Sequence, residues 1–275
     1  HMQFLGNSIP EIAAEKAGII KPGRPVVFGG TDPQAAAVVE NAARARGSRY
    51  VQVEYGLLQN VACTLDGSRF DFGGRGGMEL RLLGLYQPRN AAVALTAAEV
   101  LRKGGFAIEE AAIREGLAAA RWPARFEKLC DAPAVLFDGA HNPQGVSGAA
   151  ACLAHYFPGK RVRMVMGVMA DKAYTEMAAL LAPHAACVCC VTPDTPRALP
   201  AQSLCAVFVE LGVPSQAYAS VRAGVEAALL DSAADGVPLI GLGSLYMYAE
   251  FCDALASCKK LQKTGKKGID KGGEV

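Results

Sequence analysis

Short apolar runs alternate with longer segments of helical period along most of the chain. Apolar runs of this length are typical of strands buried on both faces, and their alternation with helices is typical of a parallel sheet. The second half repeats the pattern about five times, which predicts a Rossmann-like open sheet. We expect its strands at residues 134–140, 161–168, 184–192, 216–219 and 238–242, and its helices at 143–156, 174–181, 201–211, 220–230 and after residue 245.

The first half shows the same alternation over a shorter distance. We expect strands at 24–30 and 50–54, a hairpin at 61–74, and helices at 33–46, 90–103 and 108–121. A loop and a helix precede the first strand, so this sheet is expected to be incomplete. Proline stops the last helix at Trp122-Pro123, where we place a boundary. The prediction is therefore an α/β chain with a first domain at 1–122, a second at 123–257 and a basic flexible tail at 258–275.

Composition changes this picture only at the C-terminal end. The 275 residues are 51% hydrophobic and 20% charged, with a mean hydropathy of +0.19, as expected of a globular protein. Of the net charge of +2, the last seventeen residues contribute six lysines and two acidic residues, or +4, which leaves −2 for the rest. Because nucleic-acid binding needs basic residues gathered on a folded face, we expect no nucleic-acid partner.

The nine cysteines indicate the compartment rather than a metal site. No Cys-x-x-Cys pair occurs, and three of the cysteines lie in the apolar run 185–191, so zinc is not expected. An odd number of mostly buried thiols favours a reducing compartment, and we expect a cytoplasmic protein. The chain has no apolar stretch of membrane-spanning length and no leader sequence, so no membrane partner is expected either.

Common nucleotide-binding motifs are missing from the sequence. There is no Gly-x-x-x-x-Gly-Lys-Ser/Thr pattern for phosphate binding. The run Gly241-Leu242-Gly243-Ser244-Leu245-Tyr246 follows a predicted strand but has tyrosine where a dinucleotide fingerprint has its third glycine. A dinucleotide-binding dehydrogenase therefore rests on the sheet pattern alone.

The most specific motif is Phe137-Asp138-Gly139-Ala140-His141-Asn142-Pro143, at a predicted strand end and helix start. Ligands gather at the carboxyl ends of strands in open α/β sheets, and helix N-termini favour anions. On residue type alone, Asp138 and His141 are equally a turn aspartate and a histidine of the capping region. The position nevertheless makes both candidates for a ligand site.

Other polar motifs stand at comparable places along the chain. From the pattern alone, these motifs are interpreted as solvated charges on a helix, a helix cap, an exposed arginine and polar loop residues without a ligand. They are Glu15-Lys16-Ala17-Gly18-Ile19 in a helix capped by Ser8, Gln87-Pro88-Arg89-Asn90-Ala91-Ala92, Pro123-Ala124-Arg125-Phe126-Glu127, Met166-Gly167 with Asp171-Lys172, Thr192-Pro193 with Arg197, and Gly243-Ser244-Leu245-Tyr246.

Taken in this order, the motifs resemble those of folylpolyglutamate synthase/dihydrofolate synthase, a branch of the Mur ligase superfamily. The resemblance covers nearly everything from residue 1 to residue 253 and includes the patterns Glu-Lys-Ala-Gly-Ile, Gln-x-x-Asn-Ala-Ala, Pro-Gly-Arg-x-Glu and Gly-Ser-Leu-Tyr. The chain departs from it where Ala124 replaces the glycine of Pro-Gly-Arg. The resemblance implies that residues 1–122 are the later part of a central ATPase domain and that 123–257 are a Rossmann-like glutamate-ligase domain.

The resemblance also implies a magnesium site. It assigns His1 as an Mg²⁺ ligand and Lys16, fifteen residues later, as a lysine that is carbamylated and helps to hold the metal. A carbamate offers the oxygen ligands that Mg²⁺ prefers. Its formation needs a neutral amine, which burial favours. We therefore expect Lys16 to be catalytic in this modified form.

The remaining site residues follow from the resemblance in the same way. It assigns Asn90, Arg125 and Asp138 to ATP, with Arg125 on a phosphate, a role that suits its fixed fork of donors. It assigns His141 to the glutamate substrate and the transferred phosphoryl group, as a catalytic residue. It assigns Ser244 to the incoming glutamate.

The function implied is ATP-dependent ligation of L-glutamate to a folate or dihydropteroate carboxylate through an acyl phosphate, by a monomer. The family's phosphate loop is expected before residue 1, so we expect this chain alone to have little ligase activity. The alternative is a non-catalytic module that binds glutamate or nucleotide. Which of the two synthase activities applies is left open.

Overall fold

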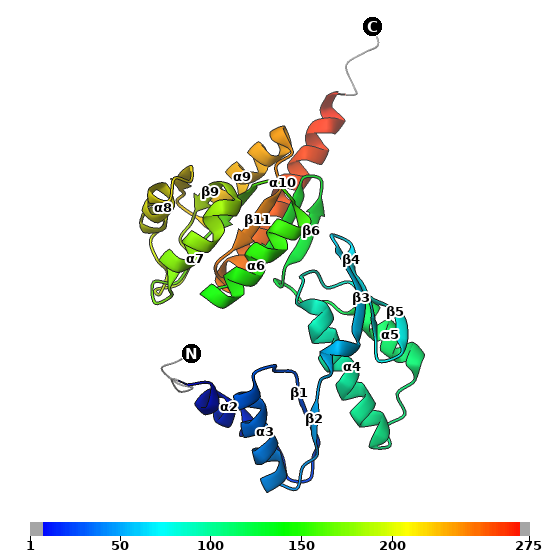
Figure 1. The fold of residues 1–275 in the computed structure, drawn as a ribbon. Helices are drawn as coiled ribbons and strands as arrows, with labels where there is room; N and C mark the ends of the chain where they lie inside the picture. Colours follow the sequence, from blue (N-terminus) through cyan, green and yellow to red (C-terminus); the bar gives the residue numbers. More distant parts are fainter. Residues whose placement is uncertain (1–7, 270–275) are drawn as a thin grey trace. The chain divides into compact units, whose positions relative to one another are not determined.

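The computed structural model describes residues 8–269 and the side chains of residues 8–258. Its contacts divide the chain into two compact units. Unit 1 comprises most residues up to Ala120, and unit 2 comprises the chain from Arg121 together with the short segments Thr64–Asp66 and Leu82–Leu85. Figure 1 shows their elements along the sequence. The predicted boundary at Trp122-Pro123 lies within two residues of this division.

Unit 1 combines a two-stranded parallel sheet with a three-stranded antiparallel one. Its elements are α2 (Ile9–Ala17), β1 (Val26–Phe28), α3 (Pro33–Ala45), β2 (Tyr50–Gln52), a 3-10 turn (Tyr55–Leu57), β3 (Leu58–Thr64), β4 (Gly67–Phe72), β5 (Arg75–Leu80), α4 (Gln87–Lys103) and α5 (Glu110–Ala119). The predicted hairpin is confirmed as β3–β4, and β5 extends it by one strand that the sequence did not predict.

Two capped helices cover the parallel pair in unit 1. Ser8 caps α2 by accepting from the Glu11 N–H (3.3 Å), as predicted, and Asp32 caps α3 by accepting from two backbone N–H groups at 2.9 Å. The helices pack through small and branched side chains that form one buried cluster. Its members are Ala13, Ala17, Ile20, Val39 and Ala43.

Unit 2 is the predicted open sheet, with strand order β10-β9-β8-β11-β7-β6. Its elements are β6 (Glu127–Asp131), β7 (Ala134–Asp138), α6 (Pro143–Tyr156), β8 (Val162–Met166), α7 (Tyr174–Leu181), β9 (Ala185–Cys190), α8 (Ala201–Glu210), β10 (Ser215–Ala217), α9 (Val221–Asp235), β11 (Leu239–Leu242) and α10 (Tyr248–Ile269), with short 3-10 turns at Ala182–His184 and Leu245–Met247. All strand pairs are parallel except β6–β7. The antiparallel edge strand β6 was not predicted.

Helices cover both faces of this sheet (Figure 1). On one face, α9 and α10 enclose a core that takes alternate residues of the strands, such as Val135 and Phe137 of β7. The rings of Phe137 and Phe251 meet edge to face at 5.2 Å. α6, α7 and α8 pack side by side on the other face. Both faces are apolar, which explains why β8 and β11 read as continuous buried runs.

The last helix extends further than the sequence indicates. α10 runs from Tyr248 to Ile269, so the described backbone of the segment predicted as a flexible tail is helical through residue 269. Within the described part of the chain, no helix has the length and apolarity needed to cross a membrane.

Candidate active site

Three strands of unit 2 end level with one another. Asp138 at the end of β7 pairs in register with Leu242 of β11, and Leu242 pairs with Met166 of β8. The chain leaves β7 for α6 on one face of the sheet and leaves β11 for α10 on the other face. Adjacent strands whose connections diverge in this way leave a crevice at their carboxyl ends, where open α/β sheets bind ligands.

Asp138 lies at the centre of this edge and is buried, with 4% of its surface exposed. Its Oδ1 accepts from the Ala140 N–H (2.7 Å) and its Oδ2 from the Phe126 N–H (2.8 Å). Burial raises the pKa of Asp138 and outweighs the opposing effects of these two donors and of the nearby Arg125 and His141. The carboxyl group therefore joins the turn before β6 to the loop after β7.

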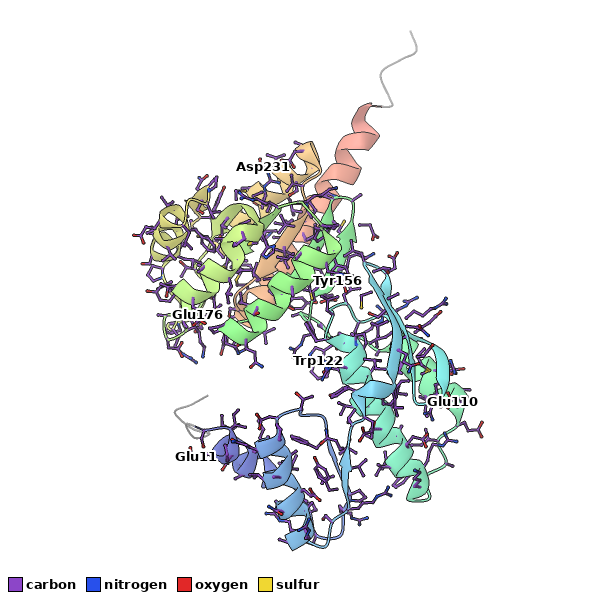
Figure 2. All side chains as sticks on the ribbon, in the orientation of Figure 1. Glu11, Glu110, Trp122, Tyr156, Glu176 and Asp231 are labelled. Atoms are coloured by element: carbon purple, nitrogen blue, oxygen red, sulfur yellow. The ribbon has the colours of Figure 1, made fainter. Side chains whose placement is uncertain are left out.

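That turn has an unusual backbone. Ala124 and Phe126 have φ angles of +59° and +43°, in the left-handed region that favours glycine. For residues with a Cβ this conformation costs on the order of 1–2 kcal/mol each. The Gly139 N–H donates to the Ala124 carbonyl (2.7 Å), and the centroid of the Phe126 ring lies 5.5 Å from that of Tyr156. Tyr156 lies on α6 and is labelled in Figure 2. Arg125 is exposed between the two left-handed residues.

His141 stands at the start of α6 with a defined tautomer. Its Nδ1 lies 2.8 Å from the Gly139 carbonyl, which can only accept, so Nδ1 carries a proton and Nε2 is the ring nitrogen left for a ligand. The adjacent Asn142 caps α6 by accepting from the Gly145 N–H (2.8 Å). Capping is thus the role of Asn142, and His141 is half-buried at the sheet edge.

Ser244 follows β11 in a loop that is bonded to the His141 loop. The Gly243 N–H donates to the Ala140 carbonyl (3.1 Å). Ser244 is 2% exposed, and its Oγ accepts from the Tyr246 N–H at 3.2 Å. The hydroxyl proton has no acceptor among the described residues, so it can be donated to a ligand. Asp138, His141 and Ser244 are therefore brought to one edge, with Arg125 in the adjoining turn.

The loops after β8 and β9 carry a second group of charges. Asp171 accepts from Arg197 (2.6 Å) and lies 3.4 Å from Lys172. The hydrogen bond from Arg197 lowers the pKa of Asp171. All three side chains are at least one-third exposed, as expected for polar loop residues. Their presence near strand ends agrees with both interpretations of these motifs.

The predicted site residues of unit 1 are exposed on two helices. Lys16 lies in the last turn of α2, and its side chain is exposed. Asn90 is the fourth residue of α4, which begins at Gln87 rather than at Asn90, so Asn90 is not the helix cap. Its Nδ2 donates to Gln87 Oε1 (2.9 Å). His1 lies outside the described residues.

A metal site does not form from the described side chains. Among residues 8–258, no three His, Cys, Asp or Glu side chains come together in a way that could hold a metal ion. The assignment of His1 and Lys16 to Mg²⁺ therefore stays a prediction from the resemblance. Burial of Lys16, on which its carbamylation was argued, is not observed.

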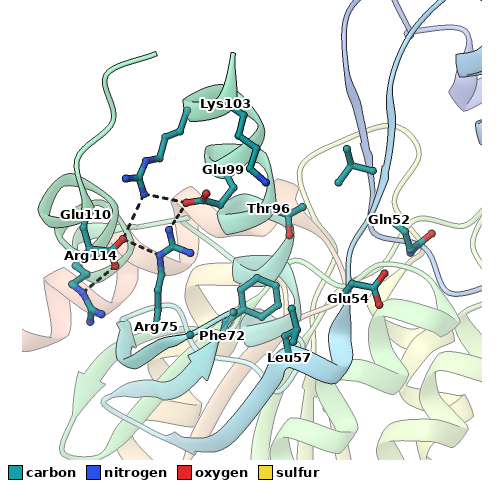
Figure 3. A pocket seen from close by; sticks show the side chains of 14 residues that line it. Gln52, Glu54, Leu57, Phe72, Arg75, Thr96, Glu99, Lys103, Glu110 and Arg114 are labelled. Atoms are coloured by element: carbon teal, nitrogen blue, oxygen red, sulfur yellow. Dashed lines mark hydrogen bonds and ion pairs between the residues drawn. The ribbon is translucent and has the colours of Figure 1, made fainter. Parts of the chain in front are cut away.

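Unit 1 also contains a hollow of about 950 Å³ that no motif indicated. Figure 3 shows that Arg75 reaches Glu99 and Glu110 on its wall, and Arg102 donates to Glu99 at 3.1 Å. Most of its charges are paired across the wall, and none of the predicted site residues lines it. We assign it no part in the candidate active site.

Folylpolyglutamate and dihydrofolate synthases are among the known proteins with similar sequences. The model of the family "Mur ligase, glutamate ligase domain" matches residues 124–244. The folylpolyglutamate synthase of Lacticaseibacillus casei is 37% identical over 256 residues, which are 90% of this chain and 58% of the relative. The dihydrofolate synthase/folylpolyglutamate synthase of Bacillus subtilis is 36% identical over 74% of the chain and 49% of the relative. The chain thus spans about three-fifths or less of these relatives' length.

Solved structures agree with these sequence matches. Mycobacterium tuberculosis folylpolyglutamate synthase, complexed with ADP and AMPPCP, has a TM-score of 0.79 at 29% identity over 93% of this chain and 61% of that one. Escherichia coli FolC, in complex with DHPP and ADP, has a TM-score of 0.73 at 26% identity over 94% and 59%. The resemblance drawn from the motifs is confirmed: residues 124–244 match the glutamate ligase domain of Mur ligases, and the chain is similar to folylpolyglutamate and dihydrofolate synthases over about nine-tenths of its length.

Proposed function

We propose that the chain takes part in ATP-dependent ligation of L-glutamate to the carboxylate of a folate or dihydropteroate. The observation that carries the proposal is the bonded edge of unit 2, where Asp138 joins the Arg125 turn to the His141 loop and Gly243 joins that loop to Ser244. The similar M. tuberculosis and E. coli proteins bind adenine nucleotides in their structures. The proposal places the nucleotide phosphates at Arg125 and the glutamate at His141 and Ser244.

The chemistry proposed at this edge proceeds in two steps. The substrate carboxylate takes the γ-phosphoryl group of ATP and releases ADP, which gives an acyl phosphate. The amine of glutamate then attacks the acyl carbon, the amide bond forms and phosphate leaves. Arg125 stabilises charge on the phosphoryl oxygens through its fork of donors.

His141 and Ser244 act on the glutamate in this proposal. The His141 Nε2 lone pair accepts a proton from the attacking amine, because Nδ1 is already engaged by Gly139. The hydroxyl group of Ser244 donates a hydrogen bond to a carboxylate of the glutamate. Asp138 contacts the nucleotide and keeps the Arg125 turn and the His141 loop in place.

Mg²⁺ belongs to the proposal only as an expectation from the resemblance. The described residues supply no cluster of side chains that could bind it. We propose His1 and carbamylated Lys16 as its ligands. Mass spectrometry in bicarbonate buffer tests this assignment: a mass increase of Lys16 by one CO₂ supports it, and an unmodified Lys16 at saturating bicarbonate overturns it.

The binding test for the proposed function is calorimetric titration of the chain with ATP, with ADP and with L-glutamate. Arg125→Ala is expected to weaken nucleotide binding without affecting glutamate, and Ser244→Ala is expected to do the reverse. If the unaltered chain binds none of the three ligands, the proposal is wrong. The accompanying assay measures ATP- and glutamate-dependent product formation with dihydropteroate and with tetrahydrofolate, which also decides between the two synthase activities.

A second function, binding without turnover, is favoured by one observation. The 275 residues contain no Gly-x-x-x-x-Gly-Lys-Ser/Thr phosphate loop. We propose accordingly that turnover by this chain alone is low even where it binds ligands. We also propose that it is a cytoplasmic monomer with small-molecule partners; equilibrium sedimentation tests the oligomeric state.

A further inference from the structure

Glu127 occupies a central place next to the candidate site that none of the assigned roles explains. It is the first residue of β6 and lies opposite Phe137 of β7 in the strand register. Its Oε2 accepts two hydrogen bonds, one from the Ala124 N–H (2.8 Å) and one from the Tyr248 hydroxyl (2.6 Å). One carboxylate oxygen therefore ties the Arg125 turn to the start of α10.

Tyr248 is well placed to hold this carboxylate. Its ring packs edge to face on Phe137, with ring centroids 5.1 Å apart, and so belongs to the core between β7 and α10. Burial, together with the hydrogen bond to Glu127, raises the pKa of Tyr248, so the phenol keeps the proton that it donates. The partner of Glu127 is thus fixed by the packing of the sheet.

The turn that Glu127 binds needs an external restraint. Ala124 and Phe126 are both left-handed, a conformation that alanine and phenylalanine disfavour when unsupported. The Glu127 bond is made to the first of these residues, Ala124. The second residue, Phe126, donates its N–H to Asp138, and the Ala124 carbonyl accepts from Gly139. Ala124 is therefore bound to Glu127 and Phe126 to Asp138, and Arg125 lies between these two residues in the turn.

We propose that Glu127, held by Tyr248, is a positioning residue that fixes residues 124–126 in their left-handed conformation and so presents Arg125 and orients Asp138 toward a nucleotide. The nucleotide part of this inference rests on the proposed function, whereas the conformational part does not. The simpler interpretation is that Glu127 only stabilises the edge strand β6. The two interpretations differ in whether relief of the strain at Ala124 compensates for loss of the carboxylate.

The experiment compares four variants of the full chain. Glu127→Ala removes both hydrogen bonds, and Glu127→Gln is the conservative variant, since one amide oxygen can still accept from both donors. Glu127→Ala combined with Ala124→Gly removes the bonds and also the strain, because glycine adopts positive φ without a Cβ penalty. Lys128→Ala is the matched control: it removes ion pairs of the next residue on β6, to Asp66 and Asp131, and leaves the turn untouched.

Two measurements decide the outcome. Hydrogen exchange of the peptide that contains residues 124–126, without ligand, is expected to be about tenfold faster in Glu127→Ala than in Lys128→Ala, which is the effect of about one lost hydrogen bond. The dissociation constant for ADP is expected to rise about tenfold in Glu127→Ala. Both are expected to return at least halfway, on a logarithmic scale, in the double variant and to stay near the unaltered values in Glu127→Gln.

The results also separate this inference from the proposed function. If Glu127→Ala exchanges no faster than Lys128→Ala, or if Ala124→Gly restores neither exchange nor affinity, Glu127 is a structural residue of β6 only. If the unaltered chain does not bind ADP at all, the proposed function fails. Exchange at residues 124–126 then still decides whether Glu127 holds the turn.

Discussion

The parallel strands of the two units differ in how deeply they are buried. All five residues of β8 are buried, as are all four of β11. In unit 1, the parallel pair β1–β2 has only three residue pairs, and every residue of both strands is half-buried. Because parallel strands rely on cover over both faces, we expect unit 2 to contribute more to the free energy of unfolding than unit 1.

The same difference separates the candidate site residues. In unit 2, Asp138 and Ser244 are buried and accept hydrogen bonds from backbone N–H groups of the adjoining loops, whereas Arg125 is exposed. Those of unit 1 lie exposed on helices, as with Lys16 and Asn90. The well-packed sheet therefore positions side chains closely, and we expect substitutions in unit 2 to disturb function and stability more than comparable ones in unit 1.

The largest expected effect comes from the core. Phe251→Ala, at a side chain that is 0% exposed, should lower the free energy of unfolding by about 3–5 kcal/mol through lost burial and a residual cavity. Phe28→Ala in half-buried β1 should cost less than half as much. Urea unfolding, monitored through hydrogen exchange of peptides from each unit, measures the loss of unfolding free energy in both variants. Equal losses for the two variants would contradict the comparison.

The next effect concerns the nucleotide. Arg125→Ala in unit 2 should weaken ADP binding by about 10- to 100-fold, since a charge-assisted hydrogen bond to phosphate contributes roughly 1.5–3 kcal/mol. Asn90→Ala in unit 1 removes a neutral hydrogen-bond partner of the nucleotide and should weaken ADP binding by less than about tenfold. Isothermal titration calorimetry gives both dissociation constants. A larger effect at Asn90 than at Arg125 would transfer the main nucleotide contact to unit 1.

A smaller effect depends on pH. Since the folded pKa of Asp138 is raised by burial, its contribution to stability is fully present below the unfolded pKa of about 4 and is lost as pH rises through the folded pKa. The free energy of unfolding of the unaltered chain, minus that of Asp138→Asn, should therefore fall as the pH rises from acidic to neutral. Urea midpoints across this range test it. A difference that grows with pH would show that the two N–H donors outweigh burial.

The smallest effect isolates backbone strain. Ala124→Gly in unit 2 should raise the free energy of unfolding by about 0.5–1 kcal/mol, because Ala124 sits at φ +59°. Gly23→Ala in unit 1, at φ +66° with open space around the added Cβ, should lower it by about the same amount. Thermal unfolding measures the pair. No change at residue 124 would mean that its neighbours accommodate the Cβ without strain.

Several elements of the fold could be predicted from the sequence. The bounds of α6 (Pro143–Tyr156) and α7 (Tyr174–Leu181) are those predicted, because the apolar strands around them leave little freedom for the helix ends. The start of α4 was predicted three residues late. Pro88 in its first turn is a signal that could have placed it at Gln87.

Strands β5 and β6 and the hydrogen bond between Tyr248 and Glu127 could not be predicted from the sequence. β6 has the sequence Glu-Lys-Leu-Cys-Asp, which is too polar and short to show strand periodicity, and β5 contains two adjacent glycines. The Tyr248–Glu127 bond joins residues 121 positions apart. Only the packing of α10 against β7 brings them together, and no local pattern encodes that packing. Ala124 is different: the glycine of the resembled motif indicates its left-handed backbone.

Where the strands β7, β8 and β11 end level with one another, two glycines in the loops, Gly167 and Gly243, have no room for a side chain. A Cβ on Gly243 would lie 2.5 Å from the Gly167 carbonyl, and a Cβ on Gly167 would lie 2.9 Å from both Met247 and Pro193. At Gly243 the backbones of two neighbouring loops touch directly, whereas at Gly167 the side chains of Met247 and Pro193 fill the space. A side chain at Gly167 or Gly243 would therefore push these loops apart and displace the edge of the sheet that carries Asp138 and Ser244.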